Sequence, residues 1–379
     1  MNHLHFFLHS CLFAFALTMF VILIYGCASI YEKSQYFVDP KSTVGPESIF
    51  DGWSYVTLET NDKNLISSMD KVMFDNDKIY ILDRKVNEVF IFDRRGRYLN
   101  KIAKQGQGRD EYLDIDDVNV YKSNIFILCS DTKTIMQYSP QGSFIKSIPL
   151  PDSFYRFSFI GDNKLCLYSS FSNNLKYNLI LYNYQTKQII AHYYPFEKNK
   201  SFIINWNFIQ SEKYGTFVAI PFDLTIYKLR KDGLSPYAEI LLGKNNIIPD
   251  NYQNVDFLTL ADDFRTKSII YDFNFIYVND DYLYLNYIFE FRSHLSLIDL
   301  KSKGAKTVIL DSYKGKRLPY IYAGALGFDK NRLVSYLTAD RVIKDNPKFR
   351  SDKNADSLLH EDDNPVLFFH QLKVRNEWR

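Results

Sequence analysis

The densest group of side chains that could hold a metal ion is acidic. It comprises Asp110, Glu111, Asp114, Asp116 and Asp117. A hard divalent cation needs several oxygen ligands, and one loop can supply them. This group lacks the alternating Asp-x-Asp-x-Asp-Gly order of a calcium loop, and Asp116 has a counterpart elsewhere in the chain. A role at a turn or strand edge is therefore the stronger prediction, and we expect no metal and no other cofactor.

Histidines and glycines offer weaker chemistry. The histidines beyond residue 26 show no metal-ligand spacing, and they are His192, His294, His360 and His370. The run Gly106-Gln107-Gly108 could cradle a phosphate, but no helical pattern follows it. We interpret its glycines as allowing positive φ angles where the chain passes between strands. The sequence contains no nucleophile elbow, zinc-protease, Cys-x-x-Cys or Walker signature.

An internal repeat indicates which elements position these residues. Residues 70–102 align with residues 116–148 without a gap. The identical pairs include Asp70/Asp116, Val72/Val118, Ile79/Ile125, Ile81/Ile127 and Gly96/Gly142. Each copy holds four short apolar runs separated by turn residues, and four strands in roughly 40–50 residues is the period of a propeller blade. Weaker copies follow, so we predict an all-β protein, a six-bladed β-propeller with four-stranded antiparallel blades.

The ends of the chain are expected to complete the ring. A propeller closes when its first and last segments share a blade. We predict that an N-terminal strand at 55–60 joins the last blade beside residues 365–373. The propeller domain would span residues 46–379, with a charged loop insertion at 340–363. We interpret that loop as a surface excursion, with a lid or partner contact as the alternative.

Composition agrees with this architecture and excludes one class of partner. Hydrophobic residues make up 46% of the chain, charged residues 24% and aromatic residues 17%. Aromatic side chains favour strands. The formal net charge of +2 gives no basic stripe, so we expect no nucleic-acid partner. Cys129 and Cys166 lie in strand-like sequence, where we expect buried free thiols rather than a disulfide.

The N-terminus indicates export. Residues 1–26 contain no Asp, Glu, Lys or Arg, and their apolar run is short for a membrane-spanning helix. The sequence Ile24-Tyr25-Gly26-Cys27 resembles a bacterial lipobox. We therefore predict a lipoprotein signal peptide at 1–26, with an uncleaved membrane anchor as the alternative. Lipidated Cys27 would begin a flexible tether over residues 27–45.

The chain resembles NHL-type propellers and, more narrowly, the six-bladed β-propeller lipoproteins of Gram-negative anaerobes. The likeness lies in the first repeat, in Gly106-Gln107-Gly108-Arg109-Asp110-Glu111-Tyr112, and in the closing Asn364-Pro365-Val366-Leu367. In that family a Gly-x-Gly-Pro-Gly-Glu-Tyr loop follows the first blade, so Arg109 and Asp110 depart from its pattern. The resemblance implies the fold and a lipid-anchored place in the cell envelope, at the outer membrane, facing the periplasm or the cell surface.

Loops at one end of the ring are the expected binding site, because loops on a rigid scaffold carry function. The residues that should gather at this channel mouth are Arg84, Lys85, Asn87, Lys104, Arg109, Glu111, Tyr112, Asp131 and Lys133. We predict a non-catalytic envelope lipoprotein that binds a protein or glycan. The alternative is a propeller lyase or hydrolase, in which Asp116 and Glu111 would be needed for turnover.

Overall fold

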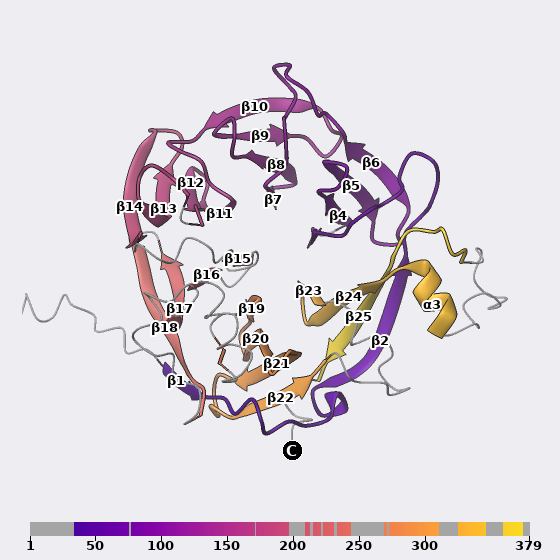
Figure 1. The fold of residues 1–379 in the computed structure, drawn as a ribbon, viewed down its shortest axis with the longest axis vertical. Helices are drawn as coiled ribbons and strands as arrows, with labels where there is room; N and C mark the ends of the chain where they lie inside the picture. The colour runs from indigo at the N-terminus through magenta and orange to yellow at the C-terminus, as the bar shows by residue number, and fades with distance from the viewer. Residues whose placement is uncertain are drawn as a thin grey trace, which may run out of the picture.

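The protein is a β-propeller whose sheets stand in a ring around a central axis (Figure 1). The computed structural model describes residues 34–75, 77–170, 172–196, 209–212, 215–220, 223–230, 233–243, 269–270, 273–310, 325–345 and 359–373. Within these ranges the strands form six sheets, five of four strands and one of five. The predicted all-β, six-bladed fold is confirmed.

The first three blades follow the chain in order, each beginning with its innermost strand. Their strands are β3 (Lys71–Phe74), β4 (Lys78–Asp83), β5 (Glu88–Asp93) and β6 (Tyr98–Ile102); β7 (Asp117–Tyr121), β8 (Asn124–Cys129), β9 (Thr134–Tyr138) and β10 (Phe144–Pro149); β11 (Arg156–Gly161), β12 (Lys164–Tyr168), β13 (Tyr177–Asn183) and β14 (Gln188–Pro195).

The other three blades have the same antiparallel order. Their strands are β15 (Ile209–Glu212), β16 (Gly215–Ile220), β17 (Asp223–Arg230) and β18 (Gly233–Leu241); β19 (Phe275–Val278), β20 (Tyr282–Phe289), β21 (Arg292–Asp299) and β22 (Ala305–Ile309); β23 (Ala325–Asp329), β24 (Arg332–Leu337), β25 (Val366–Leu372) and β2 (Phe50–Thr57).

The hydrophobic core lies between neighbouring blades. Ile91 of the first blade packs in one cluster with Val118 and Ile127 of the second. Phe90 of the first blade shares another cluster with Phe369 of the last. Each strand contributes alternate side chains to the two faces of its sheet, so both faces of a blade are covered by apolar neighbours.

The last blade closes the ring through an N-terminal strand. Strand β2 pairs antiparallel with β25, and Thr57 stands opposite Val366. The predicted closure of the last blade is therefore confirmed, but the strand lies at Phe50–Thr57 rather than at 55–60. The turn of the first blade packs tightly against this strand: Gly96 has φ +83°, and a Cβ atom there would lie 2.0 Å from the carbonyl oxygen of Thr57. Only glycine fits this turn without a shift of the backbone.

Asn364 fastens the closed ring. It is buried, and its Oδ1 accepts the backbone N–H of Ile66 at 2.8 Å. Its Nδ2 donates to the carbonyl oxygens of Glu59 at 2.8 Å and Asn64 at 2.9 Å. Asn364 precedes β25, and its amide holds this segment to the one after β2 because it satisfies three backbone groups there.

The expected flexible tether is wrong for residues 34–45. Strand β1 (Ser34–Phe37) pairs in parallel with β18 as a fifth strand of the fourth blade. Tyr36 and Val38 are buried, and Val44 donates its backbone N–H to Thr307 of the fifth blade. The inward-facing side chains of this segment pack against apolar neighbours, and these contacts hold the segment on the ring.

The charged insertion at 340–363 also differs from expectation, because it begins as a helix. Helix α3 (Ala339–Asp345) buries Val342 and Ile343 beside Phe368 of β25. The rest of the insertion up to residue 358 lies outside the described residues. A short 3-10 helix, η1 (Pro46–Ser48), precedes β2. No helix within the described ranges is long and apolar enough to cross a membrane.

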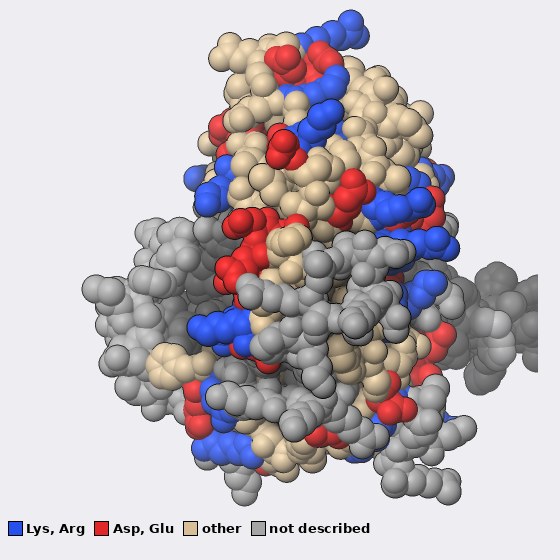
Figure 2. Space-filling view, turned by 90° about the vertical axis from the view of Figure 1, so that its right-hand side faces the viewer, with Lys and Arg blue, Asp and Glu red and all other residues tan. Residues whose placement is uncertain are grey.

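The surface has no extended region of one charge on the face that Figure 2 displays. Basic and acidic side chains alternate in small groups over the described part of this face. This pattern agrees with the balanced net charge of +2.

Candidate functional site

A cavity of about 180 Å³ lies where the innermost strands of the first three blades begin. We call it the mouth cavity, and the residues that line it are Asp70, Lys71, Leu82, Arg84, Asp116, Asp117 and Arg156. Six of these seven side chains are ionisable, three of each sign. Their gathering at one end of the ring makes this cavity the candidate site.

The repeat explains why these residues meet. Lys71, Asp117 and Arg156 each occupy the first position of an innermost strand, in β3, β7 and β11. Inner strands of adjacent blades are neighbours around the axis (Figure 1). Three positions that are far apart along the chain therefore share one cavity.

Two of the charges compensate each other. Nζ of Lys71 lies 2.8 Å from Oδ1 of Asp117 and also donates to the carbonyl oxygen of Val118 at 2.8 Å. Oδ2 of Asp117 accepts the backbone N–H of Phe157 at 3.2 Å. These bonds link the first three blades, so this pair also holds the cavity wall in place.

Arg156 is fixed by backbone groups. It is only 9% exposed, and its Nη1 donates to the carbonyl oxygens of Asp116 and Tyr155, both at 2.6 Å. Burial lowers its pKa, the negative charges of Asp117 and Asp116 raise it, and the positive charge of Arg84 lowers it. The charge of Arg156 is therefore set by acidic and basic neighbours together.

Asp116 is, with Asp117, one of two buried carboxyl groups of the site. Its Oδ2 accepts the backbone N–H of Ser130 at 2.6 Å. Burial raises the pKa of Asp116, while the bonds from Ser130 and the charge of Arg84 oppose that rise. Its repeat counterpart Asp70 is exposed and accepts from the backbone N–H of Arg84 at 2.8 Å. The same residue type thus has two environments, one at the rim and one inside.

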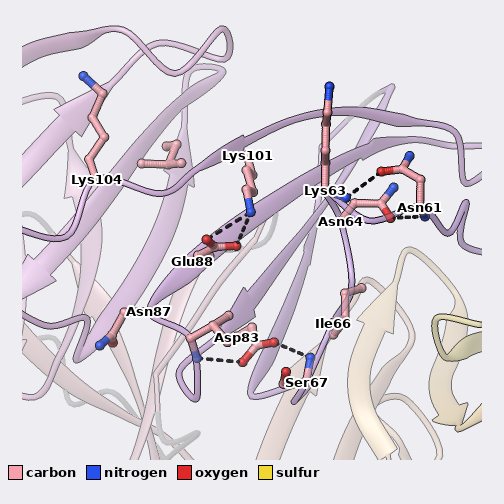
Figure 3. A network of polar contacts seen from close by, with 12 residues as sticks. Asn61, Lys63, Asn64, Ile66, Ser67, Asp83, Asn87, Glu88, Lys101 and Lys104 are labelled. Atoms are coloured by element: carbon pink, nitrogen blue, oxygen red, sulfur yellow. Dashed lines mark hydrogen bonds and ion pairs between the residues drawn. The ribbon is translucent and has the colours of Figure 1, made fainter. Parts of the chain in front are cut away.

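Of the predicted ligand residues, Arg84 is the one that lines the mouth cavity. Lys85 is exposed and Asn87 half-buried in the same β4–β5 turn, which buried Asp83 organises. Asp83 accepts the backbone N–H of Ser67 at 2.5 Å and of Lys85 at 3.0 Å (Figure 3). The turn that carries Arg84 is therefore fixed by the hydrogen bonds of Asp83.

The loop between β6 and β7 is structural for most of its length. Tyr112 was predicted to face a ligand, but it is 1% exposed, and its hydroxyl donates to the carbonyl oxygen of Asn87 at 2.8 Å. Glu111 accepts the N–H of Gly108 at 2.8 Å, and Lys104 pairs with Asp110 at 2.6 Å. These contacts stabilise the loop.

The glycines of this loop have a different role from the one expected. The positive-φ residues include neither Gly106 nor Gly108. A Cβ atom on Gly106 would lie 2.1 Å from Oε2 of Glu111. The Glu111 carboxylate occupies the space beside this glycine, and a Cβ atom there would displace the end of that side chain. Arg109, in the same loop, is exposed.

The remaining predicted residues lie in the β8–β9 turn. Asp131 and Lys133 are exposed, and Lys133 pairs with buried Asp152 at 3.0 Å. Neither residue lines the mouth cavity. Sequence reasoning named Asp117 only as a member of the acidic group, and it missed Lys71 and Arg156. The available signal was the repeat itself, which places Lys71 against Asp117.

The acidic group does not form a metal centre in the part of the chain that the structure describes, where no cluster of three or more ligating side chains occurs. Four of its carboxylates, those of Asp110, Glu111, Asp116 and Asp117, each contact a different donor. Cys129 and Cys166 are buried free thiols in different blades, as predicted. Cys27, the predicted lipidation site, lies outside the described residues.

Comparison with known proteins agrees with the fold. The putative exported protein of Bacteroides fragilis is 20% identical, with a TM-score of 0.72 over 90% of this chain and 99% of that chain. A DUF4221-family protein from Bacteroides vulgatus is 10% identical, with a TM-score of 0.56 over 86% and 97%. No curated protein matches significantly. The model of the domain of unknown function DUF4934 matches residues 38–371, so the chain belongs to the DUF4934 family.

Proposed function

We propose that this protein is an exported, lipid-anchored binding protein whose ligand occupies the mouth cavity. The observation that carries the proposal is the convergence of six ionisable side chains from three blades on one cavity. Such groups are costly to desolvate together unless a fold or a ligand compensates them. A rigid ring with converging polar groups is a typical binding architecture. The natural ligand would be an envelope protein or a glycan.

Export rests on the N-terminal segment, with its charge-free apolar run and lipobox-like Cys27. The name of the Bacteroides fragilis relative, a putative exported protein, points in the same direction. Lipidation would hold the ring at a membrane, which we propose to be the outer membrane. Cys27→Ala should abolish incorporation of labelled palmitate and leave the N-terminal segment uncleaved, which a larger mass would show. Unchanged incorporation of palmitate would contradict lipidation at Cys27.

Binding can be tested by reversing one charge in the cavity. The full chain, purified in detergent, would be screened against glycan and peptide panels by thermal shift, and hits would be titrated by calorimetry. Arg84→Glu should weaken binding by about ten-fold or more, since a charge-assisted hydrogen bond is replaced by repulsion. Arg95→Glu is the matched control, because Arg95 is exposed in the β5–β6 turn at the other end of the same blade. Equal losses in both variants would contradict a ligand in the cavity.

One observation favours a second candidate function, a propeller lyase or hydrolase. The carboxyl group of Asp116 lines the cavity, and burial raises its pKa. Arginine side chains line the same cavity. Groups of this kind serve as general acids or bases. An enzyme would lose turnover in Asp116→Asn and still bind its substrate. Glu111 would not be part of such a site, because it contacts its own loop.

A further inference from the structure

The side of the ring formed by the fourth and fifth blades exposes large apolar side chains. Phe37 is 58% exposed at the end of β1, and its register partner Leu241 on β18 is 41% exposed. In the next blade the tip of the β20–β21 hairpin exposes Phe291 by 69% and Ile288 by 46%. We call these four side chains the apolar edge. Single exposed apolar residues are common on proteins, but several on adjacent elements mark an interaction surface.

The two parts of the apolar edge belong to one junction between blades. Val38, which follows Phe37, is buried in the same cluster as Phe289, the last residue of β20. Across this junction Nζ of Lys41 lies 3.9 Å from Oε1 of Glu290. The exposed side chains alternate with this shared core, so they stand out from neighbouring parts of the surface, at β1, β18 and β20–β21 in Figure 1.

The backbone at Phe291 indicates that its exposure has a purpose. Glu290 and Phe291 form the two-residue turn between β20 and β21, and both have positive φ, 47° and 62°. This geometry favours Gly, Asn or Asp, and it is strained for a bulky side chain. Of the non-glycine residues with positive φ in the described ranges, Phe291 alone has a wholly apolar side chain. The fold gains little from so exposed a phenylalanine, so an external contact accounts for it best.

The position of β1 identifies the occupant. Ser34 begins β1 seven residues after Cys27, the proposed site of the lipid. An extended chain covers at most about 3.6 Å per residue, so Ser34 lies within about 25 Å of Cys27. A lipid on Cys27 would therefore hold the apolar edge close to a bilayer. Large apolar side chains on protruding elements suit the boundary between headgroups and acyl chains, because that boundary needs no shaped partner.

We infer that the apolar edge inserts into the surface of the lipid bilayer and orients the propeller on it. The inference rests on the proposed lipid anchor, which would fix only one point of the chain, and it adds a second contact. With the fourth and fifth blades at the membrane, the mouth cavity of the first three blades lies across the ring (Figure 1). The cavity is then kept at the side of the ring away from the bilayer, open to a ligand in the envelope.

Fluorescence quenching by brominated lipid tests this contact in the full, lipidated chain. Phe291→Cys would be labelled with an environment-sensitive dye and reconstituted in vesicles of neutral phosphatidylcholine, with or without bromine on the acyl chains. Cys129 and Cys166 are buried, and Cys27 would carry the lipid, so the dye goes to the new cysteine. The dye at position 291 should lose about half of its fluorescence in the brominated vesicles, because it lies at the depth of the acyl chains.

Two variants serve as controls for position and for folding. Val86→Cys is the matched position, because Val86 is 39% exposed in the β4–β5 turn, which joins the second and third strands of the first blade. A dye there should keep its fluorescence. Phe291→Asn should leave the melting temperature unchanged or raise it, since asparagine suits the turn. It should also reduce the quenching of a dye at Phe37→Cys about two-fold or more, because one of the inserted side chains is lost.

The outcomes separate this inference from the anchor. If the protein co-floats with vesicles but bromine quenches the dyes at positions 291 and 86 equally, or quenches neither, the inference is wrong and the anchor stands. Dyes at position 291 that quench one another between molecules, with no effect of bromine, would assign the apolar edge to a second copy and overturn the bilayer contact. A protein that does not co-float with vesicles would overturn both proposals.

Discussion

Acid should destabilise this propeller through one histidine. His370 lies on β25 in the closing blade and is fully buried. Its Nε2 is 3.4 Å from Oγ of Ser335, and the ring packs edge-on against Phe50 with centroids 6.3 Å apart. Burial lowers the pKa of His370 from its usual 6.5 to about 4. The folded state therefore contains neutral imidazole.

The size of the effect follows from the two pKa values. Below pH 6.5 the imidazole of the unfolded chain is protonated, whereas that of the folded chain stays neutral down to about pH 4. The free energy of unfolding therefore decreases as the pH is lowered from 6.5 to about 4. Each pKa unit corresponds to about 1.4 kcal/mol, which gives a full loss of about 3 kcal/mol. At about pH 4.5 the expected loss is about 2.5 kcal/mol.

Urea denaturation at about pH 7 and about pH 4.5 measures this contribution. His370→Leu keeps an apolar group of similar volume and removes the proton site. Its loss of stability between the two pH values should be smaller than that of the original chain by about 2.5 kcal/mol. Carboxylates that titrate in the same range are common to both proteins and cancel. His360→Gln, at an exposed position, should behave like the original chain. Equal losses in the original chain and His370→Leu would refute the reasoning.

Three further predictions concern the scaffold. Gly96→Ala should lower the free energy of unfolding by about 3 kcal/mol or more, since the added methyl collides with the carbonyl of Thr57. Gly52→Ala has a similar φ of +81° but open space, so urea unfolding should show a cost of only about 1 kcal/mol; equal costs would contradict the collision. Asn364→Ala should cost about 2–4 kcal/mol, because three backbone groups lose a buried partner, and hydrogen exchange should rise first at the blade junction. Tyr112→Phe should cost about 1–3 kcal/mol in urea without changing ligand affinity; a selective loss of affinity would restore it as a ligand residue.

The blade architecture could be predicted because the repeat is strong where it matters. Ile79 and Ile81 recur as Ile125 and Ile127, which marks the same strand in both copies, and the residues between them are buried as well because both faces of the strand are covered. The closing strand could be placed because an unclosed propeller would expose two edges. Both arguments use constraints that hold for the whole ring, so local irregularities did not affect them.

The elements that were missed are short and depend on tertiary contact. Strand β1 (Ser34–Phe37) buries Tyr36 but has only four residues, too few to establish a period. Helix α3 presents only Val342 and Ile343 as large apolar residues among charged neighbours. Both form because a prebuilt propeller surface offers them a place to pack, and a sequence alone does not display that surface.

The loop that resembled a family motif attracted attention for the wrong reason. Aromatic and charged side chains in a loop suggest recognition, yet Tyr112 fills a gap between blades and Glu111 closes its own turn. In a sequence, the residue types that fill a loop cannot be distinguished from those that contact a ligand. Only the direction of the side chain separates them.

The mouth cavity was harder to predict because it arises where the repeat diverges. The pairing of Asp70 with Asp116 is conspicuous as an identity, whereas the next position changes from Lys71 to Asp117 and reads as a mismatch. In the ring these mismatched positions face one another, and the change of sign creates an ion pair instead of a repulsion. Identity between blades reflects packing that every blade shares, while charge divergence at one structural position makes a surface that no single blade could form. In a propeller built from imperfect repeats, the first residues of the innermost strands are therefore the positions where differences between copies indicate a site.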